Sequence, residues 1–207
     1  MSQGFEAVLS EEALPLRPAA EDPLGILADR VLAGDTEAFG ELVARTEPRI
    51  LGLAWRILGD RDLARDAAQE AYLRAFRFLG SYRRGESFEP WLVRIAVHAC
   101  YDLSKKRGPL PVVPEILESF VSEDGPLPAD EAVLLRQRRD LVRRALSDLP
   151  EGERAALVLR DLEGYSTEEA ARILGVRPVT VRSQAATARA KLAAACARLM
   201  APKGGRP

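Results

Sequence analysis

The chain of 207 residues has few of the residue types that build metal-binding, disulfide-stabilised or catalytic sites. It holds one histidine and two cysteines, Cys100 and Cys196, which lie far apart in Ala-rich stretches. Structural zinc sites need clusters of Cys and His, so no metal site is expected and both thiols are predicted to be buried and reduced. The sequence also lacks a nucleophile–base pair and a Gly-rich phosphate loop, which predicts neither an enzyme nor a cofactor.

Long apolar runs and strand patterns are missing as well. No stretch approaches the ~20 apolar residues that a membrane span needs. Residues 1–18 lack the basic start and apolar run of a signal peptide. Alternation of polar and apolar residues, which marks β-strands, is absent. The expectation is an all-α, cytoplasmic protein that does not insert into a membrane.

Charge is unevenly distributed along the chain, although the formal net charge is only −1. Residues 1–30 carry six acids and two bases, and residues 108–131 carry six acids and no base. Residues 132–207 carry 15 bases and eight acids. A basic C-terminal part favours phosphate binding, although a solvated Arg-rich surface would have the same composition.

The helical pattern divides the chain into two small helical domains joined by a flexible, acidic, Pro-containing linker, with a helix-turn-helix in the C-terminal domain. Their predicted bounds are residues 25–107 and 132–200, and the linker is residues 108–131. Residues 1–24 form an acidic N-terminal extension and residues 201–207 a tail, and both are expected to be disordered.

Residues 165–192 (YSTEEAARILGVRPVTVRSQAATARAKL) are typical of two helices joined by a tight turn. Ser166 and Glu169 form a capping box, Gly175 ends the first helix, and Pro178 begins the second. The second helix has an apolar face of Val181, Ala185, Ala188 and Leu192, and an opposite face of Arg182, Ser183, Ala186, Thr187 and Ala190. Such a pair suits the DNA major groove, and an ordinary amphipathic hairpin is the alternative.

Two helices of the first domain each have a polar face opposite an apolar stripe. In the helix predicted over residues 60–79 this face comprises Asp66, Gln69, Glu70 and Leu73. Spacing alone favours a merely solvated face there. In the helix predicted over residues 90–106 the face comprises Arg94, His98, Tyr101 and Lys105, followed by Lys106 and Arg107. Cations interleaved with rings suit single-stranded nucleic acid, whose phosphates and bases they contact.

Three segments, in order, resemble the bacterial RNA polymerase sigma factors, specifically the short extracytoplasmic-function type. Residues 62–76 (DLARDAAQEAYLRAF) resemble the polymerase-binding helix of that family, and residues 88–107 (FEPWLVRIAVHACYDLSKKR) its promoter-melting helix. Residues 149–176 with the TVRS of residues 180–183 resemble its domain that reads the −35 element. The resemblance implies binding to core RNA polymerase and promoter DNA, and leaves an anti-sigma factor open as a further partner.

The resemblance also implies a role for each residue set. It assigns polymerase binding to Asp66, Gln69, Glu70 and Leu73. Contacts to the −10 DNA fall to Tyr82, Arg94, His98, Tyr101, Lys105, Lys106 and Arg107. Contacts to the −35 DNA fall to Arg177, Thr180, Arg182, Ser183, Ala186, Thr187 and Arg189, with Lys191 as a further phosphate contact.

The sequence departs from the family pattern at two places. His98 stands where family members usually have Asn, which predicts an altered base preference. Gln184, Ala186 and Thr187 replace two basic residues and a larger one, which predicts weaker phosphate anchoring. Two alternatives therefore stay open: a sigma-like protein-interaction module with weakened DNA reading, and an autonomous helix-turn-helix regulator.

Overall fold

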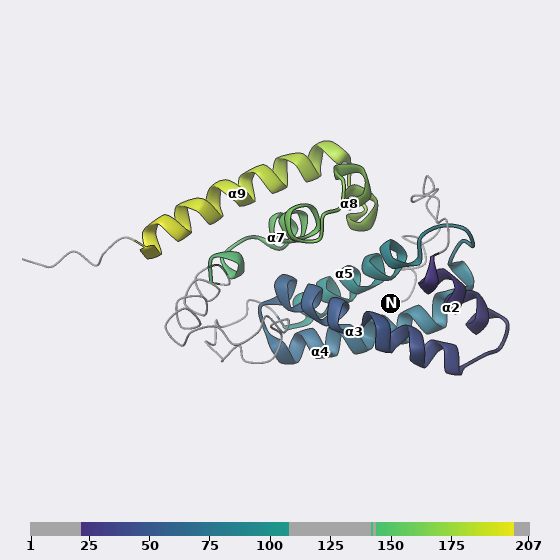
Figure 1. Cartoon of the computed structure of the whole chain (residues 1–207). Helices are drawn as coiled ribbons and strands as arrows, with labels where there is room; N and C mark the ends of the chain where they lie inside the picture. The colour runs from purple at the N-terminus through teal and green to yellow at the C-terminus, as the bar shows by residue number, and fades with distance from the viewer. Residues whose placement is uncertain (1–21, 108–141, 143, 201–207) are drawn as a thin grey trace, which may run out of the picture.

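A computed structural model describes residues 22–107, 142 and 144–200 of the chain (Figure 1). Every regular element within these ranges is helical, which confirms the predicted all-α class. The predicted linker, residues 1–21 of the predicted N-terminal extension and the tail lie outside the described residues. Residues 22–24, which were predicted to belong to that disordered extension, instead cap and begin the first helix.

The N-terminal domain is built from four helices and a short 3-10 turn. These elements are α2 (Pro23–Leu32), α3 (Glu37–Leu58), α4 (Arg61–Phe78), η1 (Leu79–Ser81) and α5 (Phe88–Arg107). Helices α3, α4 and α5 pack on one another, and α2 lies against α3. Asp22 caps α2 by accepting from the Leu24 N–H at 3.0 Å, and its second oxygen accepts from the Phe88 N–H at 2.7 Å. One carboxylate therefore joins the beginnings of α2 and α5.

A left-handed glycine and a capping aspartate separate α3 from α4. Gly59 ends α3 with φ +72°, the left-handed conformation that glycine adopts at little cost. Asp60 begins α4 as its N-cap, accepting from the Leu63 N–H at 2.9 Å.

Pro48 does not begin a new helix, because α3 continues through it from Glu37 to Leu58. An interior proline removes a hydrogen bond and crowds the carbonyl four residues earlier. Apolar side chains on both sides of it offset that cost, since Leu42 and Ile50 are both buried in the core.

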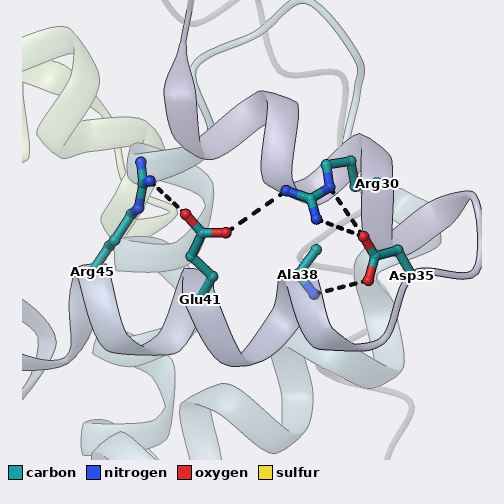
Figure 2. A network of polar contacts seen from close by, with 5 residues as sticks. All are labelled: Arg30, Asp35, Ala38, Glu41 and Arg45. Atoms are coloured by element: carbon teal, nitrogen blue, oxygen red, sulfur yellow. Dashed lines mark hydrogen bonds and ion pairs between the residues drawn. The ribbon is translucent and has the colours of Figure 1, made fainter.

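An ion-pair network fixes the turn between α2 and α3 (Figure 2). Arg30 of α2 donates to Asp35 from Nε at 3.0 Å and from Nη2 at 2.7 Å. The other Asp35 oxygen accepts from the Ala38 N–H at 3.2 Å, and Glu41 lies between Arg30 and Arg45 at 3.7 and 2.5 Å. These contacts, with Arg30 foremost, hold the pKa of Asp35 below its usual range.

The C-terminal domain comprises α7 (Glu151–Leu157), η2 (Val158–Leu162), α8 (Thr167–Leu174) and α9 (Pro178–Met200). The predicted capping box is confirmed: the Glu169 N–H donates to Ser166 Oγ at 3.1 Å and the Ser166 N–H to Glu169 Oε2 at 2.8 Å. Gly175 ends α8 at φ +66°, as predicted. The sequence did not predict η2, a π-helical turn in which the Glu163 N–H donates to the Val158 carbonyl at 2.9 Å.

The apolar stripes predicted for α4 and α9 form core. Ala68, Ala71, Tyr72, Ala75 and Leu79 are all buried, as are Val181, Ala185 and Ala188, whereas Leu192 is half-buried. Most of the core forms one apolar cluster that includes residues of both domains. A smaller cluster joins Leu146, Leu149, Leu157 and Ala188 inside the C-terminal domain.

The prediction that both cysteines are buried is confirmed for one of them and wrong for the other. Cys100 is buried, whereas Cys196 is only half-buried, and neither is in a disulfide. Among the described residues, no three His, Cys, Asp or Glu side chains gather as they would to hold a metal ion. Nor is any described helix both long and apolar enough to cross a membrane.

Candidate polymerase and DNA interfaces

The polar face predicted on α4 is solvent-accessible over most of its length. Asp66 and Gln69 are exposed, and the Leu73 side chain is 56% exposed, although it is apolar. Glu70 is half-buried and accepts from Arg74 Nε at 2.7 Å. Arg74 also donates from Nη1 to Asp102 of α5 at 2.7 Å, so this pair of contacts ties the polar face of α4 to α5.

Sequence reasoning missed an aromatic extension of this face. Phe76 lies one helical turn beyond Leu73 and is 51% exposed. Its ring meets Phe39 of α3 edge to face, with 4.9 Å between the ring centroids. Leu73 and Phe76 expose apolar side chains on a helix that otherwise presents charge, which is the composition of a protein-binding surface. The i, i+3 spacing from Leu73 was the signal that could have found Phe76.

The face predicted on α5 is only partly open. Lys105 and Lys106 are exposed, but Arg94, His98 and Tyr101 are half-buried. The His98 and Tyr101 rings lie edge to face with centroids 6.3 Å apart. Burial, and then the positive charge of Arg94, lower the pKa of His98 to about 4, so the imidazole is neutral at pH 7. The side chain of Arg107 lies outside the described residues.

The structure places Tyr82 in the aromatic core, away from the open part of α5. Its ring is 6% exposed and packs against Phe88 and Trp91, with centroids 5.2 and 5.8 Å away. The hydroxyl donates to the Glu86 carbonyl at 2.5 Å, and burial raises the pKa of Tyr82 to about 12. A base could stack on Tyr82 only after its loop moved, so that role stays a prediction. Trp91 itself is buried, at 9% exposed.

The outward face of α9 is open, as predicted. Arg182, Ser183, Ala186 and Thr187 are exposed, Arg177 is exposed at the preceding turn, and Thr180 is half-buried. Sequence reasoning missed Val179, which is 58% exposed at the beginning of the same helix. Helices that enter the DNA major groove present small and cationic side chains to the base edges and apolar groups to thymine methyl groups, and the start of α9 has this composition.

Two cations expected to contact phosphate are instead paired with acids of their own domain. Arg189 donates to both Asp161 oxygens, at 2.6 Å from Nε and 2.7 Å from Nη2. Lys191 Nζ lies 2.8 Å from both oxygens of Glu153. These pairs hold α9 against η2 and α7, so in this conformation both cations are occupied within the domain.

Gln184 points into the domain rather than toward the outward face of α9. An ideal Cβ built on Gly152 of α7 would lie 2.8 Å from Gln184 Nε2. The amide therefore occupies space that only a glycine leaves free. The departure from the family pattern at Gln184 consequently affects the packing of α9 on α7, whereas Ala186 and Thr187 change the outward face.

Both domains match known families of sigma-factor regions. Residues 42–109 match the family described as Sigma-70 region 2, and residues 139–192 match Sigma-70, region 4. The chain is 36% identical over 170 residues to the RNA polymerase sigma-H factor of Pseudomonas aeruginosa, covering 79% of this chain and 88% of that protein. It is 35% identical over 172 residues to the ECF RNA polymerase sigma-E factor of Escherichia coli K12, and the match covers 79% of this chain and 89% of that protein.

Two solved structures have a similar arrangement of helices. CnrH, in complex with the cytosolic domain of CnrY, is 29% identical with a TM-score of 0.59, covering 82% of this chain and 94% of that one. The sigma factor RpoE of Bartonella quintana, in complex with the anti-sigma factor NepR, is 22% identical with a TM-score of 0.62, and the match covers 77% of this chain and 97% of that one. At this identity the likeness is one of fold alone.

Proposed function

The chain belongs to the extracytoplasmic-function sigma factors of bacterial RNA polymerase, and on that premise we propose which of its surfaces bind polymerase, −10 DNA and −35 DNA. A sigma factor recognises promoters for RNA polymerase, and it is a transcription initiation factor rather than an enzyme. The observation that carries the assignment is the exposure of two predicted faces, one on α4 and one on α9, while the opposite side of each helix is buried.

Core polymerase docks on α4. The exposed side chains of Asp66, Gln69 and Leu73, together with Glu70, give an acidic rim around an apolar anchor. Phe76 extends the apolar part of this surface, and such anchors carry most of the energy of a protein interface.

The −35 element is bound in its major groove by the first half of α9. Arg182 and Ser183 are the candidates for base or backbone contacts, and Arg177 for a phosphate. Thr180, Ala186 and Thr187 line the same surface. Arg189 holds α9 in place through Asp161, and it contacts phosphate only if that pair opens.

The −10 element is melted and captured along α5. Separating stacked base pairs costs about 1.4 kcal/mol per step, and capture of an unpaired base supplies part of this free energy. Lys105, Lys106 and Arg107 track the phosphates, and His98 and Tyr101 with Arg94 contact bases, with Tyr82 as a further base contact once its loop moves. The neutral imidazole of His98 can donate or accept a hydrogen bond, which supports a base preference different from that of an amide.

The domain bounds and cellular setting complete the proposal. Residues 25–107 serve as the polymerase and −10 domain, and residues 132–200 as the −35 domain, joined by residues 108–131. Both targets place the protein in the cytoplasm. An anti-sigma factor is a further proposed partner, because CnrH, a structural neighbour, was solved in complex with the cytosolic domain of another protein.

Run-off transcription tests the proposal. Purified core polymerase is given a promoter library with and without this protein, and start sites are sequenced. Start sites that arise only with the protein establish its activity and show both promoter elements. Binding to core polymerase without such start sites would instead favour the interaction-module alternative, and no binding to core would contradict the α4 assignment.

A further inference from the structure

The outward face of α9 is apolar along its midline. Val179, Ala186 and Ala190 follow one another at the spacing i, i+7 and i+11, on the side of the helix opposite the buried Val181 and Ala185. All three are exposed, and Val179 is the largest of them, at 58% exposed. The part of α9 that faces away from the domain core therefore has an apolar centre, and its bulkiest group lies in the first turn.

The packing of the domain does not account for Val179. Its side chain belongs to neither of the two apolar clusters that the described residues form. Pro178 already begins α9 with a fixed φ, and a β-branched residue is a poorer helix former than alanine. Single exposed apolar residues are common on protein surfaces, but the first residues of a recognition helix are those that contact base edges. Val179 is therefore placed where a DNA contact is made.

Cations and a small polar group flank this midline, and acids are missing from it. Helix α9 contains no Asp or Glu over Pro178–Met200, whereas α7 and α8 each have two acids in the first turn. Arg182 and Ser183 are exposed on either side of Val179, three and four residues farther along, and Arg177 is exposed just before the helix. An apolar centre with cations at its borders suits a DNA groove, in which phosphates line both sides of the base edges.

The major-groove edge of a base pair offers a valine one apolar group. Thymine has a C5-methyl group there, whereas cytosine, adenine and guanine are distinguished by hydrogen-bond donors and acceptors. A valine side chain forms no hydrogen bonds, so its favourable contact with a base edge is the burial of that methyl group. 5-Methylcytosine has the same methyl group at the same ring position. A valine contact therefore distinguishes methylated from unmethylated pyrimidines.

We propose that Val179 is a specificity-determining residue that reads the C5-methyl group of one pyrimidine in the −35 element. Thymine and 5-methylcytosine satisfy this contact, and uracil and cytosine do not. The inference rests on the proposed role of α9 in −35 binding. Ser183, one helical turn along, accommodates both methylated bases, because its hydroxyl donates to thymine O4 and accepts from the cytosine amino group. Methylation of a cytosine at this position therefore strengthens promoter binding.

Base analogues in the −35 duplex test the contact without changing the protein. Run-off transcription on the promoter library gives the −35 element, and each of its thymines is replaced singly by deoxyuridine, which lacks only the methyl group. Competition against a labelled parent duplex measures the affinity of the full chain bound to core polymerase. At the position that Val179 reads, loss of one buried methyl group should weaken binding about fourfold.

Val179→Ala identifies the methyl group that the side chain contacts. The variant should bind the parent duplex about fourfold more weakly than wild type, and it should bind the parent and deoxyuridine duplexes equally well. Alanine is the better helix former, so the substitution does not weaken α9 itself. Leu162→Ala is the matched control, because Leu162 is 53% exposed and follows Asp161, which holds the later turns of α9 through Arg189. This control should respond to deoxyuridine as wild type does.

Methylated cytosine provides the reverse test. At the same position the T·A pair is replaced by C·G, and the cytosine is then methylated at C5. Wild type should gain about fourfold in affinity on methylation, and Val179→Ala should gain nothing. An equal gain in both proteins would show that methylation acts through the shape or stiffness of the duplex, and it would overturn the proposal.

The outcomes separate this inference from the proposed function. If the complex prefers the −35 duplex to a scrambled one but deoxyuridine weakens binding at no position, the methyl contact is refuted and the sigma function stands. Equal losses on deoxyuridine in wild type and Val179→Ala also refute it, because another side chain then reads the methyl group. A complex with no preference for any −35 duplex instead overturns the proposed role of α9.

Discussion

Arg189 of α9 meets Asp161 of η2 in a two-pronged ion pair, with both carboxylate oxygens within 2.7 Å of guanidinium nitrogens. The arginine strengthens the acidity of its partner, since the hydrogen bond from Arg189 lowers the pKa of Asp161. A planar guanidinium fixes orientation as well as distance when it pairs through two nitrogens. The pair therefore sets the position of α9 relative to the π-helical turn.

Asp161→Asn should free Arg189 for a DNA phosphate. Each phosphate contact adds about 0.9 to the slope of log affinity against log salt concentration. We expect Asp161→Asn to steepen the slope for a −35 duplex by about that amount, whereas Arg189→Gln leaves it nearly unchanged. Arg177→Gln, at the proposed phosphate contact, is the matched comparison and should flatten the slope. If Arg189→Gln flattened the slope as much as Arg177→Gln, Arg189 would be a phosphate contact in the complex.

Leu73→Ala should weaken binding to core polymerase without affecting stability. The side chain is 56% exposed, so its removal costs the free protein little. Loss of an apolar anchor at an interface costs about 1–2 kcal/mol, or roughly tenfold in affinity. Ile26→Ala on α2 is a matched control, because Ile26 is 57% exposed. Competition binding to core polymerase measures both, and equal affinities for the two variants would exclude Leu73 from the interface.

His98 should make the protein less stable as pH falls from about 6.5 toward 4. Burial and the charge of Arg94 lower the pKa of His98 from 6.5 to about 4. The charges of Arg74 and Lys105 also lower this pKa, and the charge of Asp102 raises it. The unfolded chain therefore takes up the proton first, and the stabilisation present above pH 6.5 is lost as pH falls through the folded-state pKa. The loss is on the order of 2 kcal/mol.

Urea unfolding of wild type and His98→Asn at pH 7 and pH 5 measures this effect. The carboxylates contribute equally to both proteins, so any difference between the two proteins in how the free energy of unfolding changes with pH is due to His98. The chain has one histidine, and its imidazole NMR signal reports the folded-state pKa directly. A titration midpoint near 6.5 would contradict the prediction.

Thr46→Val should destabilise the N-terminal domain by about 1–2 kcal/mol through a lost hydrogen bond. Thr46 is 5% exposed, and its hydroxyl donates to the Leu42 carbonyl at 2.8 Å. The Tyr72 hydroxyl lies 2.9 Å from Thr46 Oγ1 and donates to it, and burial raises the pKa of Tyr72 to about 12.

A double-mutant cycle with Tyr72→Phe isolates this contact. Valine has the shape of threonine, so Thr46→Val leaves the Tyr72 hydroxyl buried without its acceptor. Adding Tyr72→Phe removes that hydroxyl, and the double variant should be more stable than the sum of the single effects by about 1 kcal/mol. Strict additivity in thermal or urea unfolding would show that the two hydroxyls do not interact.

Features governed by neighbours in the sequence could be predicted from the sequence. The capping box of Ser166 and Glu169 and the end of α8 at Gly175 were both predicted correctly, because each is decided within about four residues. The buried and outward faces of α9 also followed from helical spacing.

Features governed by distant contacts could not be predicted. The pairing of Glu163 with Arg56 joins residues 107 positions apart, and no local pattern announces it. The burial of Tyr82 against Phe88 and Trp91 likewise depends on contacts that no local pattern indicates, and the −10 contact that the family resemblance implies for Tyr82 stays a prediction. The π-helical turn at Val158–Leu162 has ordinary helix-forming residues, so its extra residue per turn reflects tertiary packing.

The close approach of Gln184 to Gly152 links the evolution of two positions that lie on different helices. A side chain at position 152 would occupy the place of the Gln184 amide, 2.8 Å from an added Cβ. Relatives with a larger residue at position 152 should therefore have a shorter or differently directed residue at position 184, so that the two vary together. A side chain at position 152 would first displace the end of Gln184, and so it would reach the DNA-facing surface of α9 only through the packing behind that helix.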